Sequence, residues 1–331
     1  MIPTAEDLAE AYAVTRRATQ RTPLLESVAL AGACGAGRVF VKAESLQKAG
    51  SFKIRGATWR LARLSDAERA KGVVAYSSGN FAQGLAAAGQ AAGVPVTIVM
   101  PVDAPEMKRL ATIGFGARVV LCDHGERPRE EAASALARQI AAAEGLVLLH
   151  PFDDPLIVAG QAGAGLEALE QLTEIGVSPD LVACPVGGGG LLGGLALAFR
   201  HASRDTRIFA VEPVGYNGMG ASLAAGGVTR VAAGGRTLCD ALQATEPGRA
   251  PFAAAKWAGV EGLTVPDAAV RRAMRFAFEK LKLVLEPSGA VAIAALLEGA
   301  LPVTGRVAVV IASGGNIALT DFIALTGPDL D

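Results

Sequence analysis

The chain has 331 residues, 51% of them hydrophobic and 19% charged, which is enough for one large or two medium domains with buried cores. Its 31 Lys and Arg residues nearly balance its 32 Asp and Glu residues, so the charge pattern indicates no nucleic-acid partner. The longest uncharged run, residues 181–199, contains Pro185 and six glycines, which argues against a membrane-spanning helix.

The N-terminus and the cysteines bear on the cellular location. No basic stretch followed by an apolar core is visible at the N-terminus, so we expect no secretory signal and a cytoplasmic protein. The cysteines lie far apart and form no Cys-x-x-Cys pair, which predicts reduced thiols and neither a disulfide framework nor a zinc site. They are Cys34, Cys122, Cys184 and Cys239.

Short apolar runs alternate with amphipathic stretches along nearly the whole chain, which predicts alternating strands and helices. After an N-terminal helix over residues 5–18, the predicted strands are 38–42, 73–76, 96–100, 117–122, 147–149, 181–184, 208–211 and 307–312. The other predicted helices are 52–64, 81–92, 127–143, 157–172, 191–200, 267–282 and 289–298. Residues 215–248 have no clear period and are expected to form a loop-rich segment that borders the active site.

This alternation favours an α/β fold with two domains, whose twisted, mostly parallel sheets are flanked by helices. We expect a large domain of residues 1–68 plus 148–331 and a small domain of residues 69–147. In parallel sheets, ligands bind at the carboxyl ends of the strands, so the strand-to-helix turns are where functional residues are expected.

Four consecutive glycines, Gly187, Gly188, Gly189 and Gly190, follow the predicted strand 181–184 and precede Leu191 at the start of an apolar helix. Residues without side chains let consecutive backbone N–H groups approach one anion, and the helix N-terminus adds a favourable dipole. The turn therefore predicts a phosphate site. A close-packed glycine turn is the alternative, and Glu212 at the end of the next predicted strand keeps a dinucleotide site open.

Lys53 lies among small and apolar residues at the predicted start of a helix. Burial and a positive helix terminus both lower the pKa of a lysine, which favours the neutral amine that forms an imine. A single lysine is ordinarily a solvated surface residue, so this position gains weight only together with other motifs.

Two further turns carry hydroxyl and amide groups. Ser77, Ser78, Gly79 and Asn80 follow the predicted strand 73–76, where they can bind a carboxylate, and the Asn80 amide can donate to a phenolate oxygen. Ser313 follows the predicted strand 307–312, and its hydroxyl can meet a ring nitrogen. A plain helix cap or a tight turn is the alternative in both places.

The motif order resembles that of the fold type II (tryptophan synthase β-like) pyridoxal-phosphate enzymes, in the branch of serine/threonine dehydratases and serine racemase. The resemblance spans essentially the whole chain, and its lysine segment differs from the one typical of cysteine synthases. The matching segments are Thr22-Pro23-Leu24, Lys42 to Gln47, Ser51-Phe52-Lys53-Ile54-Arg55-Gly56-Ala57, Ser77 to Gly84, His150 to Asp154, the four glycines, Glu212-Pro213, Glu286-Pro287-Ser288-Gly289-Ala290 and Ser313-Gly314-Gly315-Asn316.

The resemblance implies a role for each motif residue. Lys53 would carry pyridoxal 5'-phosphate as an imine, with Phe52 beside the ring and Asn80 at its 3-oxygen. Gly187 through Leu191 would hold the phosphate, Ser313 would meet the ring nitrogen, and Glu286 would also contact the cofactor. The substrate would lie against Ser77, Ser78, Gly79, Asn80 and Phe81, with Lys53 and Ser78 as the catalytic residues.

A neutral Ser313 hydroxyl cannot keep the ring nitrogen protonated as a carboxylate would, which makes the ring a weaker electron sink and favours loss of a β-substituent. The implied reaction converts L-threonine, L-serine or a related 3-hydroxy amino acid to a 2-oxo acid and ammonia, with Lys53 removing the Cα proton. Ser78 matches the acid or base of serine racemase on the opposite ring face, so racemisation of serine or another amino acid is an open alternative.

The sequence departs from this family pattern at Phe81, in the loop after Glu212 and at Ala241, to which no role is assigned. Phe81 stands where many dehydratases have His, which either shifts specificity toward 3-hydroxyaspartate or 3-phenylserine or reflects inward packing. Glu212 matches a metal ligand of some relatives, but Tyr216, Asn217 and Gly218 follow it without a second carboxylate, so a divalent cation is doubted.

Rival functions use the same motifs in other ways. A nicotinamide-dependent oxidoreductase would use the four glycines, and a pyridoxal-phosphate- or amino-acid-binding protein without catalysis would share the architecture. Neither explains Lys53 together with Ser313.

His150, beside a Pro-Phe turn, is predicted to be structural. By resemblance, we also expect a homodimer.

Overall fold

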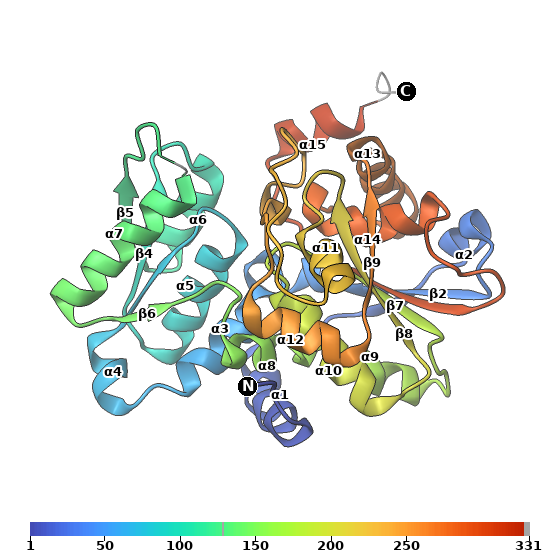
Figure 1. The fold of residues 1–331 in the computed structure, drawn as a ribbon, viewed down its shortest axis with the longest axis horizontal. Coiled ribbons are helices and arrows are strands. Elements are labelled where there is room, and N and C mark those ends of the chain that lie inside the picture. Colours follow the sequence, from blue (N-terminus) through green and yellow to red (C-terminus); the bar gives the residue numbers. More distant parts are fainter. Residues whose placement is uncertain (128, 328–331) are drawn as a thin grey trace.

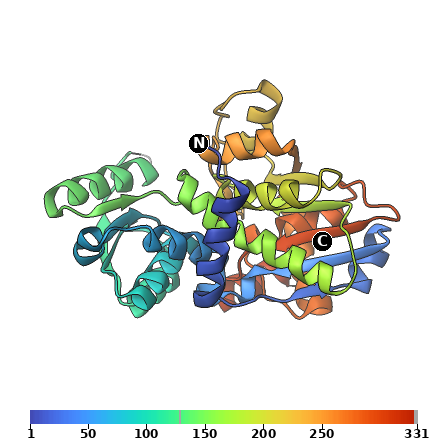
Figure 2. The same cartoon turned by 90° about the horizontal axis from the view of Figure 1, so that it is seen from below.

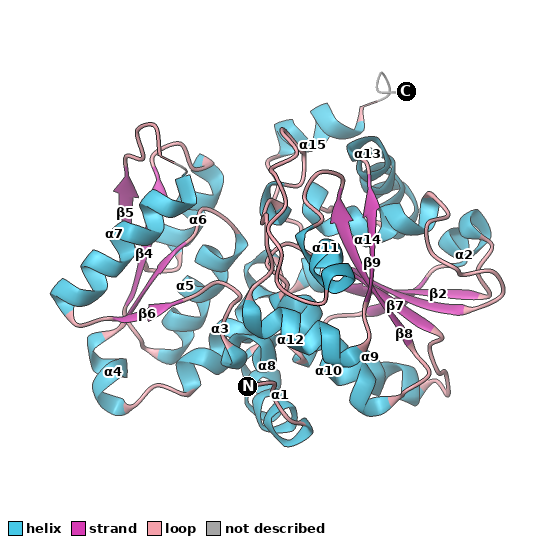
Figure 3. Cartoon of the chain, viewed as in Figure 1, coloured by secondary structure: helices cyan, strands magenta, loops and turns pink. Residues whose placement is uncertain are grey.

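The computed structural model describes residues 1–127 and 129–327. Figure 1 shows two bodies lying side by side, and each is built around its own sheet. In Figure 3 the sheets are magenta and lie between cyan helices. The predicted α/β fold with two mostly parallel, helix-flanked sheets is confirmed.

The larger sheet has six strands in the order β1-β2-β10-β7-β8-β9. Only β1 runs antiparallel to its neighbour, and the remaining pairs are parallel. The strands are β1 (Leu24–Glu26), β2 (Arg38–Ala43), β7 (Leu181–Pro185), β8 (Arg207–Pro213), β9 (Glu261–Val265) and β10 (Val307–Ala312).

The central strands are apolar on both faces because helices cover both. Alternate residues of a strand point to opposite faces, so Val182 joins the core under α9, α10 and α12, while Ala183 joins the core under α2, α13 and α14. These helices are α2 (Val28–Cys34), α9 (Gly163–Glu174), α10 (Gly190–Ala202), α12 (Arg249–Ala258), α13 (Asp267–Phe276) and α14 (Pro287–Leu297), with α11 (Gly218–Ala225) and α15 (Leu319–Thr326) at the periphery.

The smaller sheet has four parallel strands in the order β5-β4-β3-β6. Val73 and Ala75 face the core beneath α5, whereas Val74 faces the core beneath α7. The strands are β3 (Val73–Tyr76), β4 (Val96–Pro101), β5 (Arg118–Cys122) and β6 (Val147–Leu149), and the helices are α4 (Asp66–Lys71), α5 (Asn80–Ala92), α6 (Glu106–Gly114) and α7 (Arg129–Glu144). The predicted domain boundaries remain a prediction, and one placed after β6 would keep this sheet whole.

Three helices lie at the junction of the two bodies: α1 (Ala5–Ala18), α3 (Lys53–Ala62) and α8 (Pro155–Gln161). In Figure 2 the dark-blue α1 crosses this junction. Helix α3 packs against α8 through Gly56 and Gly160, where an added Cβ on Gly160 would come within 2.7 Å of the Gly56 Cα. The glycines therefore set how closely the two helices approach, and with them the position of Lys53.

All eight predicted strands are present with ends within two residues, but the short strands β1 and β9 were not predicted. The predicted helix 157–172 is wrong as one element, because α8 ends at Gln161 and α9 begins at Gly163. The predicted helix 267–282 is α-helical only to Phe276 and continues as a π-helical turn (Ala277–Leu281). The segment 215–248 is mostly irregular, as predicted, apart from α11 and a 3-10 turn (Asp240–Leu242).

Six short helices, among them α4 and α6, have no counterpart among the predicted elements. Short helices of this kind carry a weak periodic signal, and α4 buries none of its residues. No described helix combines the length and apolar character needed to cross a membrane.

Candidate active site

Lys53 begins α3, and the residues before it pair with the turn that follows β10. Ser51 forms an antiparallel bridge with Gly314, and the Phe52 N–H donates to the Ser313 carbonyl at 3.3 Å. This pairing brings together two motifs that lie 260 residues apart in the sequence (from residue 53 to residue 313). Ser313 is buried, and its hydroxyl makes no hydrogen bond with any described residue.

The Lys53 amine lies in a largely apolar environment. Its Nζ donates to the Pro151 carbonyl at 3.1 Å and lies 5.3 Å from the centroid of the Phe52 ring and 5.6 Å from that of Phe81. Burial lowers the pKa of Lys53 to about 8, since no carboxylate offsets the loss of hydration. Near neutral pH the share of neutral amine is therefore larger than for an ordinary lysine.

Phe81 points inward. Its side chain is 2% exposed and belongs to the core between α3, α5 and the smaller sheet. The structure therefore places it both in a core and near the lysine amine. The inward packing that the sequence left open is observed, and its effect on substrate choice remains a prediction.

The turn that follows β3 approaches Lys53 through a close helix crossing. An added Cβ on Gly84 of α5 would come within 3.0 Å of the Lys53 Cβ, so only glycine fits there. The Ser77 hydroxyl accepts from the Gly79 N–H at 3.2 Å, while the partly buried Ser78 hydroxyl makes no hydrogen bond with a described residue. Ser78 is therefore available to a ligand.

Asn80 is held by two other motifs. Its amide Nδ2 donates to Glu286 Oε1 at 2.5 Å, and its Oδ1 accepts from Asn316 Nδ2 at 2.8 Å. Burial raises the pKa of Glu286 to about 7, against the opposing effect of Lys108, whose Nζ lies 3.7 Å from Oε2. Glu286 therefore orients the Asn80 amide that was expected to meet the cofactor oxygen.

The four glycines form a tight turn between β7 and α10. Gly189 has φ 93°, and an added Cβ on Gly188 would lie 2.4 Å from the Phe152 ring. The N–H groups of Gly187, Gly188 and Gly189 donate to no described backbone or side-chain acceptor. The close packing that the sequence left as the alternative is therefore observed, while the N–H groups without an acceptor, ahead of a helix N-terminus, remain compatible with the predicted phosphate site.

Glu212 does not face the glycine turn with a free carboxylate. Its two oxygens each accept a backbone N–H at the start of α11, from Met219 and Gly220, at 2.8 Å. Burial raises the pKa of Glu212 to about 7. Within the described ranges, no group of three His, Cys, Asp or Glu residues is placed to bind a metal. Glu212 thus anchors the start of α11.

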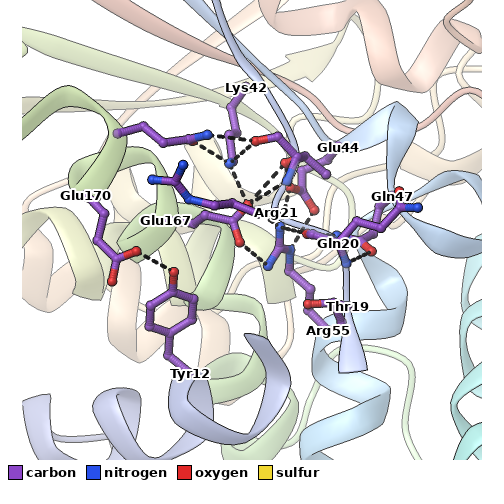
Figure 4. A network of polar contacts seen from close by, with 12 residues as sticks. Tyr12, Thr19, Gln20, Arg21, Lys42, Glu44, Gln47, Arg55, Glu167 and Glu170 are labelled. Carbon is purple, nitrogen blue, oxygen red and sulfur yellow. Dashed lines mark hydrogen bonds and ion pairs between the residues drawn. The ribbon is translucent and has the colours of Figure 1, made fainter. Parts of the chain in front are cut away.

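The sequence did not reveal a buried network of charges on the other side of α3 (Figure 4). Arg55 donates to both oxygens of Glu44, at 2.7 and 2.8 Å, and to Glu167 Oε1 at 2.9 Å. Lys42 donates to the same Glu167 oxygen at 2.6 Å. All four side chains are at most 1% exposed. The available signal was Lys42, a charged residue at a buried position of a mostly apolar strand.

Comparison with known proteins identifies the family. The family model described as "Pyridoxal-phosphate dependent enzyme" matches residues 15–314. The chain belongs to this family. The expected cofactor, pyridoxal 5'-phosphate, and the expected enzyme class are thereby confirmed, and the nicotinamide alternative loses its support.

Relatives of this pyridoxal-phosphate enzyme span several activities. It is 40% identical over 314 residues to the L-threonine ammonia-lyase of Thermotoga maritima, covering 95% of this chain and 76% of that protein. It is 36% identical over 325 residues to the L-threo-3-hydroxyaspartate ammonia-lyase of Saccharomyces cerevisiae, covering 98% and 97%. The structure of maize serine racemase matches with a TM-score of 0.90 and 32% identity, covering 98% and 97%. The predicted branch is confirmed.

Proposed function

We propose that this enzyme eliminates water from L-threonine or L-serine, with Lys53 as the residue that carries the cofactor. The observation that carries the proposal is the state of the Lys53 amine, which has one carbonyl acceptor, two aromatic neighbours and a pKa lowered to about 8. An amine that is readily neutral can form a covalent bond with a carbonyl carbon and can later accept a proton.

The residues around Lys53 fit pyridoxal 5'-phosphate. The free N–H groups of Gly187, Gly188 and Gly189 and the start of α10 would hold the phosphate, with Gly190 and Leu191 completing the turn. The free Ser313 hydroxyl would meet the ring nitrogen, and Phe52 would lie beside the ring. Asn80, oriented by Glu286, would meet the 3-oxygen. These assignments remain proposals.

When bound, the cofactor withdraws electrons from the substrate Cα and makes its proton removable. The enzyme's own groups would then decide the outcome. The Lys53 amine would take the Cα proton, because its lowered pKa suits a general base near neutral pH. The turn of Ser77, Ser78, Gly79, Asn80 and Phe81 would hold the substrate carboxylate. A neutral partner such as Ser313 favours early departure of the β-hydroxyl.

Racemisation is the second candidate because of Ser78. Its hydroxyl is partly buried and makes no hydrogen bond with a described residue, so it can exchange a proton with the substrate. Ser78→Ala should abolish interconversion of enantiomers while oxo-acid formation persists. Equal loss of both activities would assign Ser78 to carboxylate binding alone.

The test begins with the visible spectrum of the purified enzyme. We expect a band from the lysine-bound cofactor that borohydride removes and that Lys53→Ala lacks. Lys71→Ala, which changes an exposed lysine of α4, is the matched control and should keep the band. Retention of the band in Lys53→Ala would refute the assignment of Lys53.

A substrate panel then sets the reaction. L- and D-serine, L- and D-threonine, 3-hydroxyaspartate and 3-phenylserine are scored separately for oxo acid with ammonia and for the opposite enantiomer. We expect L-threonine and L-serine to give the highest kcat/KM for elimination. A higher kcat/KM for 3-hydroxyaspartate or 3-phenylserine would assign Phe81 to specificity, and racemisation faster than ammonia release would make racemase the main activity.

We also propose a homodimer, by resemblance to the fold type II enzymes of this branch, and a cytoplasmic location, because the widely spaced cysteines are free thiols. Light scattering of the holoenzyme measures the mass directly, and a mass equal to one chain of 33.6 kDa would refute the dimer. A divalent cation is not part of the proposal, and added chelator should leave kcat unchanged.

A further inference from the structure

His150 lies at the carboxyl end of the smaller sheet, beside the residue that precedes the Ser77–Asn80 turn. Strands β3 and β6 are parallel neighbours, and Ala75 is in register with Leu149. Tyr76 and His150 therefore follow one step further along each strand. The Tyr76 hydroxyl lies 3.0 Å from the His150 Nε2, and the two rings meet edge to face with centroids 5.9 Å apart.

The hydrogen bonds at the other ring nitrogen define the protonation of His150. Its Nδ1 accepts the Asp153 N–H at 2.9 Å and the Phe152 N–H at 3.4 Å. A nitrogen that accepts hydrogen bonds carries no proton, so in the neutral ring the proton is on Nε2 and is donated to the Tyr76 hydroxyl. Burial lowers the pKa of His150 and favours this neutral ring; Lys53 adds to the effect, while Asp153 and Asp154 oppose it.

The turn that His150 caps consists of residues 150–153. Pro151 has no N–H, so the turn depends on the two N–H groups that point to Nδ1. These bonds aim the Pro151 carbonyl at Lys53 Nζ, 3.1 Å away. The same turn places the Phe152 ring against Gly188 and lets Asp153 Oδ1 accept the Ala250 N–H at 2.9 Å.

We propose that His150 is a positioning residue for Lys53: its unprotonated Nδ1 caps the turn 150–153 and thereby fixes the Pro151 carbonyl that receives the Lys53 amine. The carbonyl holds the amine whenever it is not covalently engaged, both before the cofactor binds and while the lysine serves as base. His150 touches neither substrate nor cofactor in this role. The inference rests on the proposed role of Lys53 but not on the identity of the substrate.

The first measurement reads the protonation of His150 in the wild-type protein directly. Nitrogen NMR of the wild-type imidazoles at neutral pH, assigned by comparison with His150→Asn, should show His150 protonated at Nε2 and unprotonated at Nδ1. A protonated Nδ1 would overturn the proposal, because the cap would then lack its acceptor.

The second measurement follows cofactor capture by the unloaded protein, which is independent of any substrate. His150→Ala should slow formation of the visible band by about tenfold or more, since small displacements of a reacting group have effects of this size. In His150→Asn the side-chain oxygen replaces Nδ1, and the capture rate should return to within about threefold of wild type. Tyr76→Phe is the matched control, because it removes only the contact at Nε2 and should leave the capture rate nearly unchanged.

Turnover separates positioning from binding. On the best substrate of the panel, the loaded His150→Ala enzyme should show a lower kcat with an unchanged KM. Wild-type capture rates in His150→Ala, or a capture rate in His150→Asn as low as in His150→Ala, would overturn the proposal. If His150→Ala does not fold, the NMR result still decides it, because a protonated Nδ1 overturns the proposal and an unprotonated Nδ1 supports it. Absence of turnover with normal capture by the wild type would contradict the proposed reaction and leave the role of His150 intact.

Discussion

Two cationic side chains on α3, at positions 53 and 55, point into two very different environments. Arg55 is fully buried, and burial alone would lower its pKa, yet Glu44 and Glu167 raise it above the usual value. Lys53 is desolvated as well, but no carboxylate accompanies it, and its pKa falls to about 8. Burial therefore has opposite outcomes on one helix, depending on whether counter-ions are buried with the cation.

The difference separates a structural region from a reactive one. In the network shown in Figure 4, two cations face two carboxylates, and the three donors of the Lys42 ammonium reach Thr22, Glu167 and Gln171. The charged groups of this network are therefore engaged with partners. The groups with unused hydrogen-bonding capacity lie instead in the turns that follow β3, β7 and β10: the Ser78 and Ser313 hydroxyls and the N–H groups of the glycine turn.

The largest effect is expected from a variant that changes only the reactive region around Lys53. Lys53→Ala should lower kcat by more than about 10⁴-fold, because the covalent attachment and the proton transfer are both lost. The free energy of unfolding of the unloaded protein should not fall, since the variant removes a desolvated amine that has no carboxylate partner. Steady-state kinetics and urea unfolding of the same preparation measure the two quantities. A large loss of stability would contradict the contrast between the two regions.

The next largest effect is expected from a variant that disrupts the buried charge network. Arg55→Leu leaves the carboxylates of Glu44 and Glu167 buried with Lys42 as the remaining cation, and it should cost about 3–5 kcal/mol of unfolding free energy. Urea unfolding with the unloaded protein measures this cost. A cost below about 1 kcal/mol, the value typical of an exposed pair, would show that water reaches the network and that burial does not define it.

A third experiment reads the lowered pKa of Lys53 directly. The neutral amine, which captures the cofactor, increases as pH rises through the pKa of the amine. The capture rate of the unloaded protein should therefore rise with pH and level off above about 8, and near pH 7 it should exceed that of an ordinary lysine by about 10²-fold. A midpoint near the ordinary lysine value would mean that Lys53 is hydrated or paired with a carboxylate.

The smallest effect is expected at an exposed ion pair, which is compared with the buried network. Arg63 and Glu10 are bonded at 3.0 Å, with side chains 48% and 56% exposed. Arg63→Ala should change the unfolding free energy by about 0–1 kcal/mol. Measured beside Arg55→Leu under the same conditions, it isolates the part of the cost that comes from burial. Equal costs for the two variants would refute that interpretation.

The fold was predictable wherever local pattern and tertiary environment agree. The strand Val73–Tyr76 was predicted at its observed bounds because a short apolar run between polar turns is typical of a buried strand. Strand β9 was not predicted, since most of its residues are exposed and it is held in the sheet by its pairing with β8. The break between α8 and α9 at Ala162 was also missed, because the apolar residues continue across it.

The site shows the same division. Lys53, the four glycines, Asn80 and Ser313 could be named from their positions after predicted strands and from the order of the motifs. Their partners could not be named. Pro151 offers a carbonyl whose direction depends on His150, and Glu286 reaches Asn80 across the two bodies of the molecule. Contacts of this kind join residues that are far apart in the sequence and carry no local pattern.

By itself, the sequence determined which chemical groups this enzyme possesses and in what order its strands and turns occur, because periodicity and turn composition are local properties. Only the tertiary structure decided which charges are neutralised. Lys42, Lys53 and Arg55 are all removed from bulk water, but long-range packing places Glu44 and Glu167 beside Lys42 and Arg55 and no carboxylate beside Lys53. That difference, set by long-range contacts, leaves one amine free to react.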